Sequence, residues 1–228
     1  MARRLVALLP IKAHSERVPR KNFRPFNGKP LFRWMLDTLL NVEEVTQIVV
    51  NTDARGLLGQ HGLTDSPRVT IRDRSPELRG DLVSMNRIIE DDLAAAPADD
   101  YLMTHATNPL LSAATVRRAI LRYRELRASD AADSLFTVTG HQSRFYRPDG
   151  APINHDPANL VRTQDLEPIY EENSNLYLFS GSSFRATHAR IGVRPAMFVT
   201  PRLESFDIDD SEGWTLAELI GAATRHHD

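Results

Sequence analysis

The stretch LVALLPIKAHSERVPRKNFRPFNGKPL, residues 5–31, indicates the architecture of this chain. Its apolar start, 5–9, is typical of a buried strand, and Pro10 ends the run. A loop with five cationic side chains follows: Lys12, Arg17, Arg20, Lys21 and Arg24. Open α/β sheets bind nucleotides where buried strands end in loops of this kind. We therefore expect the loop to bind a polyphosphate.

Composition narrows the class of protein. The length of 228 residues suits one domain, 1–228, with ample core, and 41% hydrophobic residues are ordinary for a globular chain. A net charge of −2 disfavours nucleic acid as a partner. The absence of cysteine excludes a disulfide framework and a cysteine nucleophile. No apolar run is long enough to span a membrane, and residues 1–10 run into Lys12 without a cleavage site, so we expect a cytoplasmic protein without membrane partners.

Strand and helix patterns alternate along the chain. Strands are predicted at 5–10, 45–51, 69–72, 101–104, 134–139, 175–179 and 197–200, and helices at 31–41, 82–95, 113–128 and 212–225. Ser112 is the expected N-cap of the third helix. The alternation predicts an α/β fold with a mostly parallel sheet covered by helices on both faces.

Residues 140–173 interrupt this alternation. The segment contains Pro148, Gly150, Pro152, Pro157 and Pro168, which indicate turns and loops. Connections of this length in compact domains are usually functional. We expect an excursion from the sheet, either an active-site cover or a dimerisation arm, with a long surface loop as the plain alternative.

Two common phosphate-binding motifs are excluded. Asn27-Gly28-Lys29-Pro30 resembles part of a Walker loop, but Phe23 stands where that motif needs glycine and Pro30 where it needs Ser or Thr. A GxGxxG fingerprint is also absent. Phosphates would therefore be bound by side chains and not by a glycine-rich cradle.

Seven ordered segments resemble the acylneuraminate cytidylyltransferases, that is, the CMP-sialic acid synthetases and their relatives. They are PIKAHSERVPRKN (10–22), NTD (51–53), RSPELRGD (74–81), TNPL (107–110), the stretch around Arg162, NLY (175–177) and FDID (206–209). Each segment alone is weak evidence, but the seven occur in the family's order and together span nearly the whole chain. The resemblance implies a Rossmann-like nucleotidyltransferase fold, a three-layer sandwich, with 140–173 as the inserted arm of a homodimer. It also implies transfer of CMP from CTP to the anomeric hydroxyl of a nonulosonic or ulosonic acid, with release of pyrophosphate.

The resemblance also assigns site residues, to which we add Arg17 from its charge and position. The nucleotide-binding residues would be Lys12, Ser15, Lys21, Asn22, Arg74, Val83, Ser84 and Met85. The sugar-acid-binding residues would be His105, Thr107, Asn108, Arg162, Tyr170 and Tyr177. Asp207 and Asp209 would bind Mg²⁺, and Lys21, Arg17 and Asp209 would be catalytic.

Each assignment has a structural alternative. The cations would otherwise be solvated surface residues. Asn22 would cap a turn, and Arg74 would form a surface ion pair with Asp73 or Glu77. The aspartates would favour the N-terminus of the last helix, which we expect to be the whole role of Asp210.

The acceptor side departs from the family pattern. His105 replaces a Gln, Leu111 an Arg and Glu171 another Arg, while Arg162 is retained. Glu171 would repel an acidic sugar unless that sugar carries an amine or the side chain turns away. The acceptor therefore stays open among sialic, legionaminic, pseudaminic and Kdo-type acids or another acid. A non-catalytic nucleotide-binding or regulatory protein on the same fold is the alternative of another class. A sugar-phosphate nucleotidyltransferase is disfavoured because residues 13–15 lack its glycine-rich loop.

Overall fold

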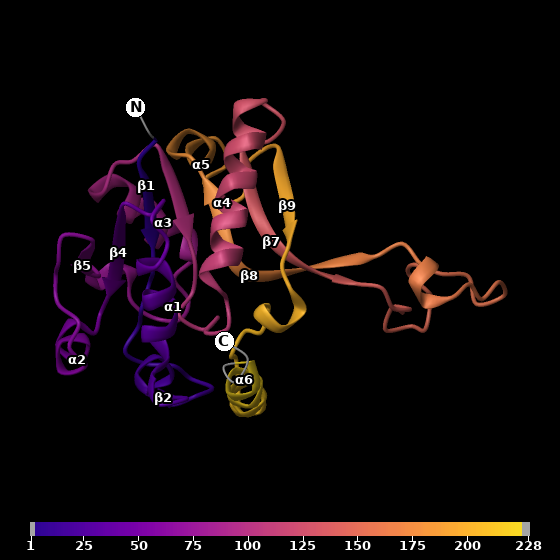
Figure 1. Cartoon of the computed structure of the whole chain (residues 1–228), viewed down its shortest axis with the longest axis horizontal. Coiled ribbons are helices and arrows are strands. Elements are labelled where there is room, and N and C mark those ends of the chain that lie inside the picture. Colours follow the sequence, from indigo (N-terminus) through magenta and orange to yellow (C-terminus); the bar gives the residue numbers. More distant parts are fainter. Residues whose placement is uncertain (1–2, 225–228) are drawn as a thin grey trace.

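A computed structural model describes residues 3–224 and shows one central sheet with an arm projecting from it (Figure 1). The seven-stranded sheet has the order β5-β4-β1-β6-β8-β7-β9. Its strands are β1 (Leu5–Leu8), β4 (Gln47–Thr52), β5 (Val69–Asp73), β6 (Asp100–Met103), β7 (Ser134–His141), β8 (Ile169–Phe179) and β9 (Pro195–Val199). Strands β5, β4, β1 and β6 are parallel, β8 is antiparallel to β6 and β7, and β7 and β9 are parallel. The mostly parallel sheet is confirmed.

Helices cover both faces because the apolar side chains of the strands alternate. On β1, Leu5 and Ala7 belong to a core shared with α1 (Leu31–Leu40), α2 (Arg55–Gln60) and α4 (Ala113–Ala128). Val6 and Leu8 point to the other face, which packs against α3 (Met85–Ala95) and α5 (Gly181–Thr187). Successive strand residues alternate between faces, so one short strand contributes to both cores. The result is the predicted three-layer sandwich.

A third, smaller core fixes the loop that follows β1. The hairpin of β2 (Pro25–Phe26) and β3 (Lys29–Pro30) closes through Asn27 and Gly28, both at positive φ. Phe26 packs against Trp214 of α6 (Ser211–Thr224), with ring centroids 5.6 Å apart. Arg24 lies over the same indole at 4.3 Å, so its role is structural. This packing attaches the basic loop to the last helix.

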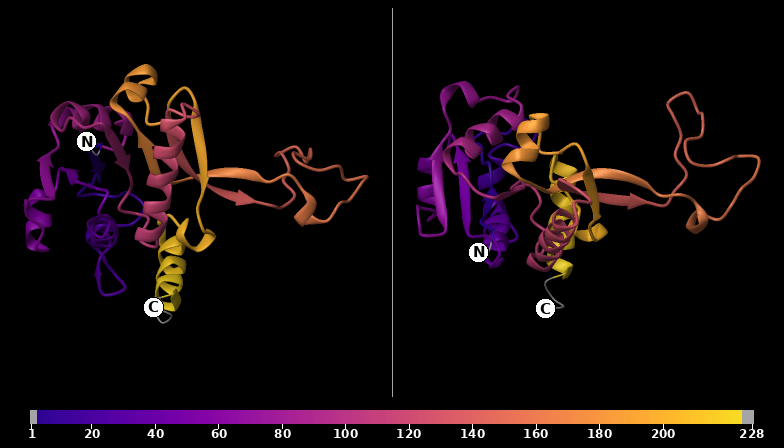
Figure 2. Two further views of the ribbon diagram at one scale, coloured as in Figure 1. Left: turned by 45° about the horizontal axis from the view of Figure 1, so that its top comes forward. Right: turned by 90° about the horizontal axis from the view of Figure 1, so that it is seen from above.

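The segment 140–173 leaves the body of the molecule as a long hairpin (Figure 2). Strands β7 and β8 continue outward as a pair, with His141 opposite Ile169 and an irregularity between Phe136 and Val138. The rest of the segment is turns and the short 3-10 helix η3 (Thr163–Asp165). Large apolar side chains on it are exposed, including Ile153, Leu160 and Val161. The hairpin therefore has little core of its own.

All seven predicted strands and four predicted helices form, with shifted bounds. Strand β8 begins at Ile169, not at 175, and α3 begins at Met85, not at 82, because Ser84 caps it by accepting from the Asn86 amide at 3.3 Å. Ser112 caps α4 as expected, accepting from the Thr115 amide at 3.1 Å. The predicted end of the last helix, Arg225, lies outside the described residues. Helices α2 and α5 and the short 3-10 helices η1 (Lys21–Phe23), η2 (Pro76–Leu78) and η4 (Arg202–Glu204) were not predicted. Between residues 3 and 224, no helix combines the length and the apolar character that a membrane span requires.

Candidate active site

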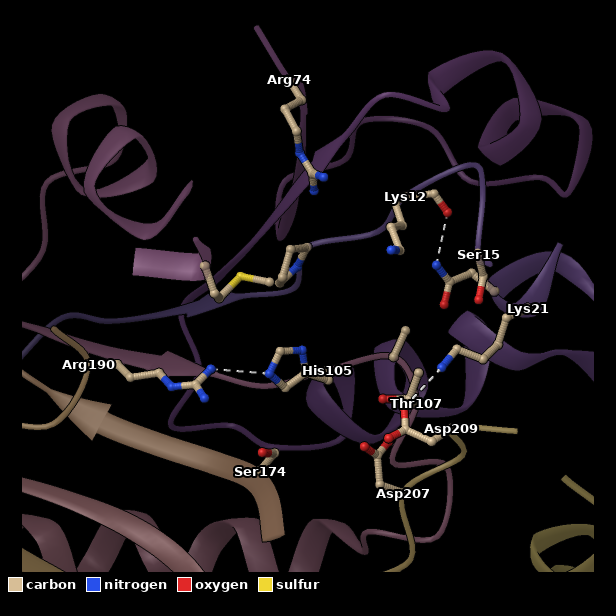
Figure 3. Close-up of a pocket in the computed structure, with 14 residues that line it drawn as sticks. Lys12, Ser15, Lys21, Arg74, His105, Thr107, Ser174, Arg190, Asp207 and Asp209 are labelled. Carbon is tan, nitrogen blue, oxygen red and sulfur yellow. Dashed lines mark hydrogen bonds and ion pairs between the residues drawn. The ribbon is translucent and has the colours of Figure 1, made fainter. Parts of the chain in front are cut away.

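A cavity of about 390 Å³, here called the main cavity, lies beyond the carboxyl ends of β1, β5 and β6. Side chains from all three loops and from the segment before α6 converge on it (Figure 3). The structure places these predicted residues in its lining: Lys12, Ser15, Lys21, Asn22, Arg74, Met85, His105, Thr107, Asp207 and Asp209. Most of the predicted site is thus brought together in one place.

The basic loop is held in shape by hydrogen bonds to its backbone. The carboxylate of Asp53, at the end of β4, accepts from the Ala13 amide at 2.7 Å. Asn22 is buried and donates to the carbonyl of Lys12 at 2.9 Å. Lys12 forms an ion pair with Asp81 across the mouth of the cavity. Asp53 and Asn22 therefore fix the loop, and Lys12 and Lys21 face inward from it (Figure 3).

Lys21 connects the loop to the acidic segment. Its Nζ donates to the carbonyl of Ile208 at 2.6 Å and lies 3.7 Å from a carboxylate oxygen of Asp209. Burial lowers the pKa of Lys21, and the charges of Asp207 and Asp209 act in the opposite direction. Arg17 does not line the main cavity, but its guanidinium lies 3.2 Å from Asp209. Two cations thus face one carboxylate.

Asp207 and Asp209 both line the main cavity, as expected for residues two apart on an extended segment. Burial raises the pKa of Asp207, with Thr107 and Lys21 acting in the opposite direction. Its Oδ1 is buried and has no hydrogen-bond partner among residues 3–224. Asp210 caps α6, accepting from the Gly213 amide at 2.7 Å, as predicted. The cap is therefore a different residue from the two that face the cavity.

Arg74 is buried and is held by a single asparagine. Its Nε donates to the side-chain oxygen of Asn51 at 2.8 Å, and its Nη2 donates to the Asn51 carbonyl at 2.9 Å. Burial lowers the pKa of Arg74. The alternative of a surface ion pair with Asp73 or Glu77 is wrong, because the guanidinium is buried and donates to Asn51. The guanidinium therefore points into the cavity (Figure 3).

Opposite the basic loop, the cavity has a cation that sequence reasoning missed. Arg190, in the loop after α5, lines the main cavity and lies 3.3 Å from Nε2 of His105. Burial, with a smaller contribution from the charge of Arg190, lowers the pKa of His105 to about 3, so the imidazole is neutral. The buried Tyr177 lies beneath Arg190, with the guanidinium carbon 3.7 Å from the ring centroid. No motif in the sequence marks Arg190.

A second cavity of about 510 Å³, here called the side cavity, adjoins the main one and shares Ser174, Asp207 and Asp209 with it. It lies at the root of the hairpin, where β7 and β8 leave the sheet. Glu171 lines it and approaches His141, with Oε2 2.8 Å from Nε2. Ser174 has a φ of 56°, in the left-handed region that favours glycine. Of the departures noted on the acceptor side, Glu171 lines this cavity and His105 lines the main one.

Several predicted residues are not brought to the main cavity. Asn108 is fully buried and donates to the Asn175 side chain at 2.7 Å, and Leu111 is in the core. Ser84 caps α3, and Val83 precedes it without lining the cavity. Arg162 pairs with Asp165 at 2.7 Å on the hairpin, and Tyr170 packs beside Gly140. Neither Arg162 nor Tyr170 lines the main cavity of its own chain.

Comparison with known proteins gives the family. A family model described as cytidylyltransferase matches residues 6–204, which includes nearly every residue of the main cavity. The chain belongs to this cytidylyltransferase family. The predicted family and the nucleotidyltransferase fold are thereby confirmed.

Similar proteins differ in the acids that their names specify. The chain is 27% identical to the CMP-N,N'-diacetyllegionaminic acid synthase of Legionella pneumophila, covering 95% of this chain and 96% of the relative. It is 21% identical to the pseudaminic acid cytidylyltransferase of Campylobacter jejuni, covering 94% and 95%. It is 26% identical to the N-acylneuraminate cytidylyltransferase of Oncorhynchus mykiss, with 95% of this chain aligned but only 50% of that longer enzyme.

Solved structures show the same fold at low identity. The CMP:2-keto-3-deoxy-manno-octonic acid synthetase complexed with CTP superposes with a TM-score of 0.62 at 15% identity, covering 98% of this chain and 99% of that one. The 4-diphosphocytidyl-2C-methyl-D-erythritol synthase of Anaerococcus prevotii gives 0.68 at 11%, covering 97% and 100%. Likeness at such identity concerns the fold alone.

Proposed function

We propose that this chain transfers CMP from CTP to the anomeric hydroxyl of a nonulosonic or ulosonic acid and releases pyrophosphate. The observation that carries the proposal is the main cavity, in which Lys12 and Lys21 face Asp207 and Asp209 across the carboxyl end of the sheet. The sugar hydroxyl attacks the α-phosphorus, the bond to the bridging oxygen breaks, and pyrophosphate leaves. The proposal thus goes beyond membership of the family, because it names an acid as the acceptor.

The nucleotide half of the cavity supplies the groups that CTP needs. Lys12 and Lys21, with Ser15 between them, would bind the phosphates and balance the charge on the departing pyrophosphate. Arg17 reinforces them from the mouth. Arg74 presents a planar set of donors, with Met85 and the segment 83–85 nearby, and would bind the cytosine edge together with Asn22.

Asp207 and Asp209 fit a hard cation. Among residues 3–224 no set of three or more acidic, His or Cys side chains is arranged to hold a metal, so a cation here would depend on the substrate phosphates for its remaining ligands. The unpartnered, buried Oδ1 of Asp207 is an oxygen that such an ion would satisfy. We assign the two carboxylates to Mg²⁺, which when bound would offset charge on the triphosphate. Lys21 orients Asp209 through their 3.7 Å contact.

The side cavity is the proposed acceptor site, because it opens onto Asp207, Asp209 and Ser174. His105, Thr107 and Tyr177 would separate the acceptor from the nucleotide. Arg162 and Tyr170 would act from the hairpin of a second subunit, which makes 140–173 the arm of a homodimer. The exposed apolar side chains on the hairpin support this pairing. We place the reaction in the cytoplasm, where nucleoside triphosphates are available.

The test is Mg²⁺-dependent release of pyrophosphate from CTP, ATP, GTP and UTP against a panel of eight- and nine-carbon sugar acids. Release is expected with CTP alone and with one acid or a few closely related ones. Omission of Mg²⁺ with added chelator should abolish it. Binding of CTP without release for any acid would contradict the transferase proposal and support the nucleotide-binding alternative. Release with every nucleotide would contradict the role given to Arg74.

A further inference from the structure

Arg190 is held in the cavity wall from three sides. Its guanidinium carbon lies 3.7 Å from the centroid of the Tyr177 ring, its Nη2 is 3.4 Å from Oε1 of Glu172, and its Nη1 is 3.3 Å from Nε2 of His105. Tyr177 also donates its hydroxyl to Glu172, which fixes that carboxylate in turn. A side chain with this much rotamer freedom is thus ordered before any ligand binds.

Because His105 is neutral, it adds no charge to the ion pair that Arg190 forms with Glu172. With its pKa near 3, His105 carries one ring proton at neutral pH. Because Arg190 has only donors, Nε2 accepts from it and the proton sits on Nδ1. Glu172 is the carboxylate in contact with Arg190, and its oxygen is shared with Tyr177. The guanidinium has five N–H donors, so it retains donors for a further partner while it lines the cavity.

Arg190 lies apart from the lysines that would bind the phosphates. Arg190 reaches His105 from the side opposite Lys21 and Lys12, and Ser174 lies below it (Figure 3). Arg190 lines the main cavity, and its partner Glu172 and the neighbouring Ser174 line the side cavity, so Arg190 lies where the two cavities adjoin. A second cation on this wall suits a second anion, distinct from the triphosphate.

We propose that Arg190 binds the carboxylate of the acceptor acid and so positions its nucleophilic hydroxyl; this inference rests on the proposed function. In a 2-ulosonic acid, the carboxylate and the anomeric hydroxyl are substituents of the same carbon. A planar guanidinium pairs with a carboxylate through two parallel hydrogen bonds, which fixes direction as well as distance. Binding of the carboxylate by Arg190 would therefore orient the hydroxyl on the same carbon toward the nucleotide. Arg162, on the hairpin, is not needed for this contact.

The test compares Arg190→Met and Arg190→Lys with two other arginine variants, using the acid of the panel with the highest turnover and its methyl ester. Arg190→Met should raise KM for the acid about 10- to 100-fold while KM for CTP stays within about twofold. Arg190→Lys should recover part of the loss. The wild type should prefer the acid to the ester, and Arg190→Met should lose that preference, which a merely structural role would not cause. Arg185→Met, an exposed residue of α5, is the matched control.

Arg202→Met tests the competing cation, because Arg202 lines the side cavity. The inference is overturned if Arg202→Met abolishes the preference for the acid and Arg190→Met retains it. It is also overturned if Arg190→Met raises KM for CTP instead. Calorimetric binding of the same acid to the CTP-loaded protein separates this inference from the proposed function. If the acid binds in a way that depends on Arg190 but is not turned over, the inference about Arg190 is supported and the proposed transferase function is contradicted. Neither binding nor turnover for any acid would overturn both.

Discussion

Asn51 accepts both hydrogen bonds that orient Arg74, one at 2.8 Å through its side-chain oxygen and one at 2.9 Å through its carbonyl. The amide nitrogen of Asn51 donates in turn to the buried Asp92 at 2.8 Å. Asp92 also pairs with Arg72, so a chain of buried polar groups runs from α3 through β4 to the cavity. Each member has a partner, which makes the network rigid.

We expect Arg74→Ala to weaken binding of CTP selectively, by about 10-fold or more, because it removes the donors that we propose bind the base. Binding of ATP, GTP and UTP, measured by calorimetry, should change less. Arg87→Ala, an exposed arginine on α3, serves as the control. An equal loss for every nucleotide would show that Arg74 binds the phosphates or only supports the fold.

Asp209→Asn should reduce kcat by at least about 100-fold while CTP binding stays measurable, because a neutral amide is a poor ligand for Mg²⁺. Asp210→Asn is the matched control one residue away. Asn is also a good N-cap, so this variant should keep both turnover and the unfolding free energy within a few tenths of a kcal/mol. Full activity of Asp209→Asn would end the metal assignment.

Stability should fall in acid because of His105. Its pKa in the folded state is about 3, below the unfolded value near 6.5, so the unfolded chain binds the proton first as the pH drops. The contribution is fully present above pH 6.5 and is lost as the pH falls toward 3. By pH 5 the loss should be about 2 kcal/mol in the unfolding free energy from urea titration.

His105→Gln removes the titrating group at this position. Between pH 7 and pH 5, the unfolding free energy of the variant should therefore fall by about 2 kcal/mol less than that of the wild type. An equal loss of unfolding free energy in the two proteins over this range would show that folding does not change the pKa of His105.

Leu160→Asp should convert the proposed dimer to monomer, since it places a charge on an exposed apolar side chain of the hairpin. Sedimentation velocity should show the dissociation constant rising at least about 10-fold, with acceptor turnover falling alongside it. Leu121→Asp, an equally apolar exposed site on α4, should leave assembly unchanged. A wild-type protein that stays monomeric at micromolar concentration would contradict the role of the arm.

Contiguous features of the site were accessible from sequence. Strand β1 and the loop with Lys12 and Lys21 could be predicted because apolar run, break and cations follow one another directly. Asp207 and Asp209 could be placed on one face from their spacing alone. Helices α2 and α5 were missed because they have only six and seven residues and include glycine.

Features that depend on distant pairing were not accessible. The outer half of β8 exists because it pairs with β7, about thirty residues earlier in the chain, while its own sequence is polar. Asn108 lies inside a matching motif, yet its side chain turns inward to Asn175. Arg190 reaches the cavity only because α5 folds back beside Tyr177. Motif spacing predicts neither the direction of the Asn108 side chain nor the place of Arg190 in the cavity.

Strand β8 belongs both to the wall of the side cavity and to the hairpin. The residues of β8 that line the side cavity, Glu171 to Ser174, are continuous with those that build the root of the hairpin. The ladder between β7 and β8 runs without a break in the chain of either strand from the sheet to the pair His141–Ile169, so the cavity wall and the hairpin root belong to one pair of strands. A partner that binds at the hairpin root would therefore contact the same strand that lines the cavity. Substitutions in the outer part of this strand pair are expected to change which acids fit.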